Sequence, residues 1–240
     1  MSRLFVTLLF LSLALVRPAV SAEEVNLYSA RQEALIKPLL DRFTEQTGIK
    51  VNMVSAKDDA LIKRLESEGR NSPADLLLTA DAGRLHRARE LGVLAPLQSE
   101  VLTQRIPASY RDPDNHWFGL SLRARPILYV RGKVDPAELS TYAALADPRW
   151  KGRICIRSSD NIYNQSLVAS MIATQGEAAT EAWARDFVAN FARPPQGGDR
   201  DQIKAAAAGQ CDIAIANTYY FAAMLNDANP AERETAAKLA

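Results

Sequence analysis

The chain has 240 residues, of which 48% are hydrophobic and 24% charged, and its formal net charge is +1. This ordinary globular balance excludes a disordered chain or a collagen-like repeat. The near-neutral charge argues against a protein that coats nucleic acid, and the length suits one large domain or two small ones.

Residues 1–22 have the pattern of a secretory signal peptide. Arg3 precedes an apolar run over residues 4–16, and the segment ends in Val20-Ser21-Ala22, a small-x-small cleavage pattern. The alternative is a membrane anchor, but the run is shorter than the roughly 20 apolar residues that a spanning helix needs. Cleavage after Ala22 leaves 27 basic residues against 28 acidic ones, so the exported protein stays near neutral.

The segment after the signal peptide alternates strands with helices. The patterns predict strands near 23–30, 49–53 and 74–80, each followed by a helix, near 30–48, 58–70 and 83–92. That order favours a parallel sheet flanked by helices, and ligands of such sheets bind at the carboxyl ends of the strands. The residues to watch there are Tyr28, Ser29, Arg31, Thr79 and Asp81.

A second lobe is predicted after the segment Arg123-Ala124-Arg125, which separates two extended runs within 116–134. Further strands are expected near 152–159 and 211–216, with helices near 162–174, 177–192 and 199–210. We therefore expect a signal peptide (1–22), an N-terminal lobe (23–122) and a C-terminal lobe (123–240), with a ligand cleft between the lobes. The last residues fall inside a helical pattern, which indicates a truncated chain.

Two cysteines, Cys155 and Cys211, each lie in a strand-like stretch. An exported chain meets an oxidising compartment, and an even cysteine count permits one bridge. We predict a Cys155–Cys211 disulfide, with two separate buried thiols as the alternative.

Enzyme motifs are missing from the sequence: it has no GxSxG elbow, no GxxxxGK[ST] loop and no HExxH. His86 and His116 are its two histidines, in a basic helical pattern and a polar turn. A histidine-based hydrolase or metalloenzyme is therefore not expected.

Three tyrosines stand where a predicted strand gives way to a helix: Tyr163, and the adjacent pair Tyr219 and Tyr220. A phenol has a pKa near 10, but a highly charged cation displaces its proton, and phenolate oxygen is a hard ligand suited to Fe³⁺. A following helix N-terminus favours the anion. The alternative is that these rings stack on a sugar or an amino acid, or only pack.

The sequence resembles the periplasmic ferric-iron-binding proteins of ABC importers, members of the type II periplasmic binding-protein superfamily. The stretches that resemble them are YSARQE, LLLTADAGRL, SLRAR, NIYNQSLVASMIA and GGDRDQIKAAAAGQCDIAIANTYY. The resemblance implies an α/β fold with two lobes, each a mixed sheet flanked by helices, and a ferric ion in the cleft. It implies that Tyr163, Tyr219 and Tyr220 are phenolate ligands and that Arg123 lies behind them or contacts an anion.

The same resemblance implies a periplasmic monomer that delivers iron to an inner-membrane ABC permease and is not an enzyme. The chain departs from the family in its first lobe, where Gln32 and Glu33 replace a histidine or a histidine–tyrosine pair. Near the third strand, Ala80 and Asp81 stand close to where some relatives have glutamate. Glu33, Gln32 or Tyr28 are then the candidate first-lobe ligands, and water or a carbonate-like anion is the alternative.

Two other readings of the sequence remain. The same fold can bind an oxyanion or a small organic solute, held by Arg31, Arg123 and Arg157 with Ser158 and Ser159. A secreted lyase on this scaffold is the third reading, although the chain has no visible base–nucleophile pair. Fold alone does not separate these functions.

Overall fold

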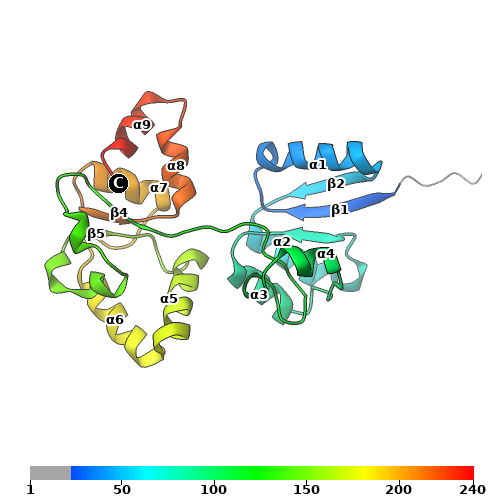
Figure 1. Cartoon of the computed structure of the whole chain (residues 1–240), viewed down its shortest axis with the longest axis horizontal. Helices are drawn as coiled ribbons and strands as arrows, with labels where there is room; N and C mark the ends of the chain where they lie inside the picture. The colour runs from blue at the N-terminus through cyan, green and yellow to red at the C-terminus, as the bar shows by residue number, and fades with distance from the viewer. Residues whose placement is uncertain (1–22) are drawn as a thin grey trace, which may run out of the picture.

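The computed structural model describes residues 23–240, and these form two lobes, each built on a three-stranded sheet (Figure 1). The predicted signal peptide lies outside the described residues. No helix within 23–240 has the length and apolar character needed to cross a membrane.

The first lobe has a parallel sheet with strand order β2-β1-β3. Tyr28 of β1 stands opposite Val54 of β2 and Leu77 of β3. The elements are β1 (Glu24–Ser29), α1 (Glu33–Thr47), β2 (Lys50–Ser55), α2 (Asp58–Glu68), β3 (Leu76–Leu78), α3 (Ala82–Glu90) and α4 (Glu100–Arg105). The parallel order follows from the βαβα sequence pattern, because each helix returns the chain to the same end of the sheet.

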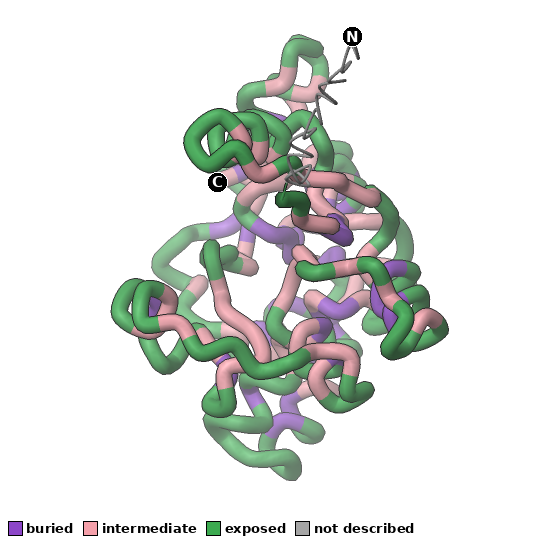
Figure 2. Tube along the Cα trace, turned by 90° about the vertical axis from the view of Figure 1, so that its right-hand side faces the viewer, coloured by how far each residue is buried: buried purple, intermediate pink, exposed green. Residues whose placement is uncertain are grey.

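The first-lobe core is small. Tyr28, Leu61 and Leu65 form its buried cluster, and α1 has no fully buried residue. The continuous apolar run Leu76-Leu77-Leu78 predicts a strand that is covered on both faces. In the structure, however, the Leu76 side chain is 53% exposed. Figure 2 shows the buried residues as short stretches between longer intermediate and exposed ones along the chain.

A long extended segment crosses from the first lobe to the second (Figure 1). Within residues 111–126 the only β-sheet pairing is an isolated bridge between Arg111 and Phe118. Two strands were expected across 116–134, but the regular strand there is β4 (Ile127–Tyr129) alone. Short 3₁₀ turns complete the connections: η1 (Gly69–Asn71), η2 (Ala108–Tyr110), η3 (Pro136–Glu138), η4 (Ala143–Ala146) and η5 (Pro148–Trp150).

The second lobe has a mixed sheet of order β4-β6-β5, with β5 parallel and β4 antiparallel to β6. A mixed sheet was expected in both lobes, whereas the three strands described in the first are all parallel. The remaining elements are β5 (Ile154–Cys155), α5 (Ile162–Gln175), α6 (Glu177–Ala189), α7 (Asp199–Ala207), β6 (Ile213–Ile215), α8 (Thr218–Leu225) and α9 (Pro230–Ala237).

Helices cover both faces of the second sheet because β6 is apolar on each side. Its isoleucines, Ile213 and Ile215, pack with Trp183 and Phe187 of α6. The alternate residues Ala214 and Ala216 belong to the cluster that contains Ile203 of α7 and Met224 of α8. This division follows from the two-residue period of a strand.

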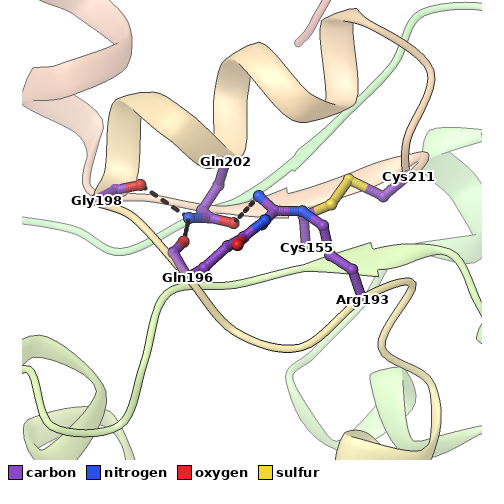
Figure 3. The surroundings of a disulfide bond; sticks show 6 residues. All are labelled: Cys155, Arg193, Gln196, Gly198, Gln202 and Cys211. Atoms are coloured by element: carbon purple, nitrogen blue, oxygen red, sulfur yellow. Dashed lines mark hydrogen bonds between the residues drawn. A yellow bond between two sulfur atoms is a disulfide. The ribbon is translucent and has the colours of Figure 1, made fainter.

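The predicted disulfide is present: Cys155 in β5 and Cys211 just before β6 are joined, with their Cα atoms 5.9 Å apart. Nearby, the Arg193 guanidinium donates to Gln202 Oε1 at 3.0 Å. The Gln202 amide nitrogen donates to the carbonyls of Gln196 and Gly198 (Figure 3). These bonds hold the loop that leads into α7.

Candidate metal site

Tyr163, Tyr219 and Tyr220 lie in the first turns of two helices, α5 and α8. Each helix follows one of two adjacent parallel strands, β5 and β6, so both begin at the same edge of the second sheet. The topology therefore brings together residues that are 56 positions apart in the sequence, and the hydroxyl of Tyr219 donates to that of Tyr163 at 3.0 Å.

The two helix starts are built differently. The Asn161 side chain caps α5 by accepting from the Tyr163 amide at 3.0 Å. Asn217 occupies the N-cap position of α8, but its side chain makes no capping hydrogen bond. Its amide nitrogen instead donates to the Tyr219 hydroxyl at 3.3 Å. The N-cap asparagine of α8 thus orients a phenol.

The rings of Tyr219 and Tyr220 contact each other, with centroids 4.4 Å apart and planes tilted by 39°. Small hard cations bind oxygen at about 2 Å. Two oxygens 3.0 Å apart, as in Tyr163 and Tyr219, can therefore bind one such ion at an angle of roughly 90°. The spacing suits adjacent ligands of a single octahedral ion.

Burial raises the pKa of both Tyr163 and Tyr219 above the ordinary phenol value of 10.0. For Tyr219, hydrogen bonding with Tyr163 and Tyr220 raises the pKa further. Without a metal ion these two phenols are neutral at pH 7. A bound trivalent cation reverses this preference, because it favours the phenolate form far more strongly than burial opposes it.

Two arginines lie over the tyrosine rings. The Arg123 guanidinium carbon is 5.1 Å from the centre of the Tyr219 ring, and that of Arg157 is 5.7 Å from the centre of the Tyr163 ring. Arg123 is exposed, whereas Arg157 also donates to the buried Asp199 carboxylate at 3.0 Å. Arg123 is the cation with more freedom to meet an incoming anion.

Tyr28 does not belong to this site. Its side chain is buried in the first-lobe core, and its hydroxyl donates to both carboxylate oxygens of Glu68, at 2.8 and 2.9 Å. The prediction of Tyr28 as a first-lobe ligand was therefore wrong, because alternation along β1 turns this residue into the core. Gln32 and Glu33 are exposed at the start of α1, beyond the carboxyl end of β1.

The first lobe approaches the tyrosines through α3, which packs against α5. Asp81 caps α3, and its Oδ1 accepts from the Ser166 hydroxyl at 2.5 Å, so the bond joins the two lobes one turn after Tyr163. The fit is tight at Gly83, where an added Cβ would lie 3.0 Å from Ile162 Cδ1. Asp81 has φ of +81°, an uncommon value for a residue other than glycine.

A separate acidic group lies in the first lobe: Asp112, Asp114 and His116 bring one ligand atom each within 4.8 Å of one another. Arg89 pairs with both carboxylates, at 3.5 and 2.7 Å, and His116 Nδ1 lies 2.9 Å from Asp112. The Arg89 guanidinium therefore already balances the negative charge of these two carboxylates. His116, which the sequence places in a polar turn, is half-buried and partnered by Asp112.

Two members of the predicted oxyanion group already have acidic partners. Arg157 is paired with Asp199, and the Ser158 hydroxyl donates to Asp160 at 3.0 Å. Asp199, Asn164 and Ser166 were not among the predicted site residues, yet their hydrogen bonds hold the tyrosine-bearing helices. One feature of the sequence could have drawn attention to Asp199. It is an acidic residue at the first position of a predicted helix, directly after Gly197-Gly198.

Residues 71–234 match the family model described as bacterial extracellular solute-binding protein, and the chain belongs to that family. Iron uptake protein A1 of Synechocystis sp. is 53% identical over 214 residues, which are 89% of this chain and 59% of that protein. The Fe(3+)-binding periplasmic protein of Serratia marcescens is 33% identical over 84% of this chain and 59% of its own length.

Among solved structures, Trichodesmium IdiA (FutA) in complex with iron and citrate ligands superposes with a TM-score of 0.88 at 52% identity. The match covers 90% of this chain and 69% of the solved one. The fold is therefore that of the type II periplasmic binding proteins. The chain spans less than two thirds of the length of the curated relatives named here.

Proposed function

We propose that this chain captures ferric iron outside the cytoplasm through the phenolates of Tyr163, Tyr219 and Tyr220. The observation that supports the proposal best is the 3.0 Å separation of the Tyr163 and Tyr219 hydroxyls, with the Tyr220 ring beside them. Three phenolates would match the charge of a 3+ ion and provide hard oxygen ligands. The names of the Synechocystis, Serratia and Trichodesmium relatives agree with iron as the cargo.

In this proposal the second lobe holds the ion first and the first lobe completes the site. Gln32 or Glu33 at the start of α1, a water molecule or a carbonate-like anion would fill the remaining positions, with Arg123 next to the anion. We place the lobe boundary in the crossing segment, at residues 122–123. Closure of the lobes about this segment would exclude water, and opening would release the ion.

We further propose that the protein works in the periplasm as a monomer, after removal of the signal peptide, and delivers iron to an ABC permease in the inner membrane. It would act as a carrier and not as an enzyme. The solute-binding family and the name of the Serratia relative support this location and role.

Equilibrium dialysis against ferric citrate tests the proposal. Tyr163→Phe, Tyr219→Phe and Tyr220→Phe should each weaken iron binding by more than about 100-fold, because loss of even an outer-shell partner typically costs about 10–100-fold. Tyr129→Phe is the matched control, since Tyr129 lies in β4, among the residues packed against the second-lobe core. Equal affinity in all four variants would overturn the ligand assignment. A folded protein that binds no iron but retains an oxyanion or organic solute would favour the alternative cargo.

A further inference from the structure

A buried charged network lies behind the three tyrosines. Asp199 is the first residue of α7, and its carboxylate is fully buried. One carboxylate oxygen, Oδ2, accepts from the backbone amide of Asn217 at 2.6 Å and from Arg125 at 2.9 Å. The other accepts from Arg157 at 3.0 Å. The carboxylate therefore contacts the backbone two residues before Tyr219.

Arg125 extends this network to the second tyrosine-bearing helix. One arm of its guanidinium donates to Asn217 Oδ1 and the other to Asn164 Oδ1, both at 2.8 Å. Asn164 is the neighbour of Tyr163 in α5, and its own amide nitrogen donates to the Arg157 carbonyl at 2.8 Å. A single guanidinium thus joins the start of α5 to the start of α8.

The residues of this network are largely shielded from water, so water cannot easily take the place of their hydrogen-bonding partners. The Arg125 side chain is only 9% exposed, and Asn164 and Asn217 are both buried. The planar guanidinium fork fixes two directions at once, which a lysine ammonium does not do. Removing one partner from a buried ion pair is costly, because it leaves the other charge buried without compensation. The network is therefore geometrically defined and not a loose surface ion pair.

We propose that Asp199 and Arg125 are positioning residues that set the separation of the tyrosine-bearing helix starts and so determine how well one ion is held. The role in iron affinity rests on the proposed function, because it assumes that Tyr163 and Tyr219 bind the same ion. Neither residue contacts the ion. They act through Asn217 and Asn164, which neighbour the phenols in sequence.

Asp199→Asn tests the proposal, since it removes the charge with little change in volume. The matched control is Asp212→Asn, which breaks the ion pair with Arg153 (2.7 Å) in the same lobe, away from the tyrosines. Hydrogen–deuterium exchange of the iron-free protein should rise in the peptides 157–170 and 213–225 of the first variant only. Iron affinity should fall about 10–100-fold in Asp199→Asn, with a shifted visible absorption band, and stay unchanged in Asp212→Asn.

A purely structural role would lower the stability of Asp199→Asn while leaving its iron affinity and band as in the wild type, and that result overturns the proposal. If Asp199→Asn does not fold, Arg125→Lys serves instead, because it keeps the charge but loses the fork. It should show the same paired rise in exchange and fall in affinity, and wild-type values in both would also overturn the proposal. If the wild type binds no iron, the proposed function fails, whereas the exchange data still decide whether the network holds the two helix starts.

Discussion

The Cys155–Cys211 disulfide offers a prediction whose size can be worked from the structure. The bridge closes a loop with a sequence separation of 56, which begins at the end of β5 and contains α5, α6 and α7. In the chain-entropy model, a loop of this length removes about 14 cal/mol/K from the unfolded state, or about 4 kcal/mol at 25 °C. Cys155→Ala with Cys211→Ala should therefore lower the free energy of unfolding by up to about 4 kcal/mol.

Alanine is the suitable replacement because both cysteines lie in an apolar cluster, where a serine hydroxyl would be left without a partner. Thermal unfolding can be followed by tryptophan fluorescence, since two of the three tryptophans, Trp150 and Trp183, belong to the second-lobe core. At about 2–4 °C per kcal/mol for a chain of this size, the midpoint should fall by roughly 8–16 °C.

Reductant provides the control for this experiment. Dithiothreitol should lower the midpoint of the wild type toward that of the double variant and leave the double variant unchanged. A loss below about 1 kcal/mol, against the 4 kcal/mol expected from loop closure, would refute the reasoning that the bridge acts by restricting the unfolded second lobe.

Three further predictions concern the tyrosines and the contact between the lobes. Because burial raises the pKa of Tyr163 and Tyr219, ferric binding at pH 7 should release one proton from each of these two phenols, measured by pH-stat against a ferric citrate blank. Release of fewer than two protons per ion would contradict the assignment of both as ligands. Ser166→Ala removes the hydrogen bond to Asp81 and should cost about 0.5–1.5 kcal/mol in urea unfolding, whereas an unchanged midpoint would mean that this bond adds nothing to stability. Burial raises the pKa of Tyr142 to about 12, so its contribution to stability is complete below pH 10 and is lost as the pH rises to 12. Tyr142→Phe should accordingly flatten the alkaline loss of stability, and an equally steep loss would argue against this tyrosine as its source.

Much of the second lobe was predictable because its signals are local. The strand at 213–215, the helix starts at Tyr163 and Tyr219, and the even cysteine count all come from short stretches of sequence. The grouping of Tyr163, Tyr219 and Tyr220 came from the family resemblance. Its structural reason is that the adjacent parallel strands β5 and β6 end at one edge of the second sheet.

The supporting contacts were not predictable in the same way. Asp199 reaches Arg125 and Arg157 across 74 and 42 residues, and no periodicity connects such positions. Tyr28 was misplaced because its position near the carboxyl end of an expected strand suggested the ligand edge, whereas its side chain lies in the first-lobe core. Which way a residue at a strand end points depends on register, and register is a property of the assembled sheet.

The most direct test of the central proposal is the visible absorption spectrum of the purified protein during titration with ferric citrate, with Tyr129→Phe and Tyr219→Phe measured in parallel. We predict a broad phenolate-to-iron band that saturates at one ion per chain in the wild type and in Tyr129→Phe, and is strongly reduced in Tyr219→Phe. A folded wild-type protein that develops no band, or a Tyr219→Phe variant whose band matches the wild type, would contradict the account.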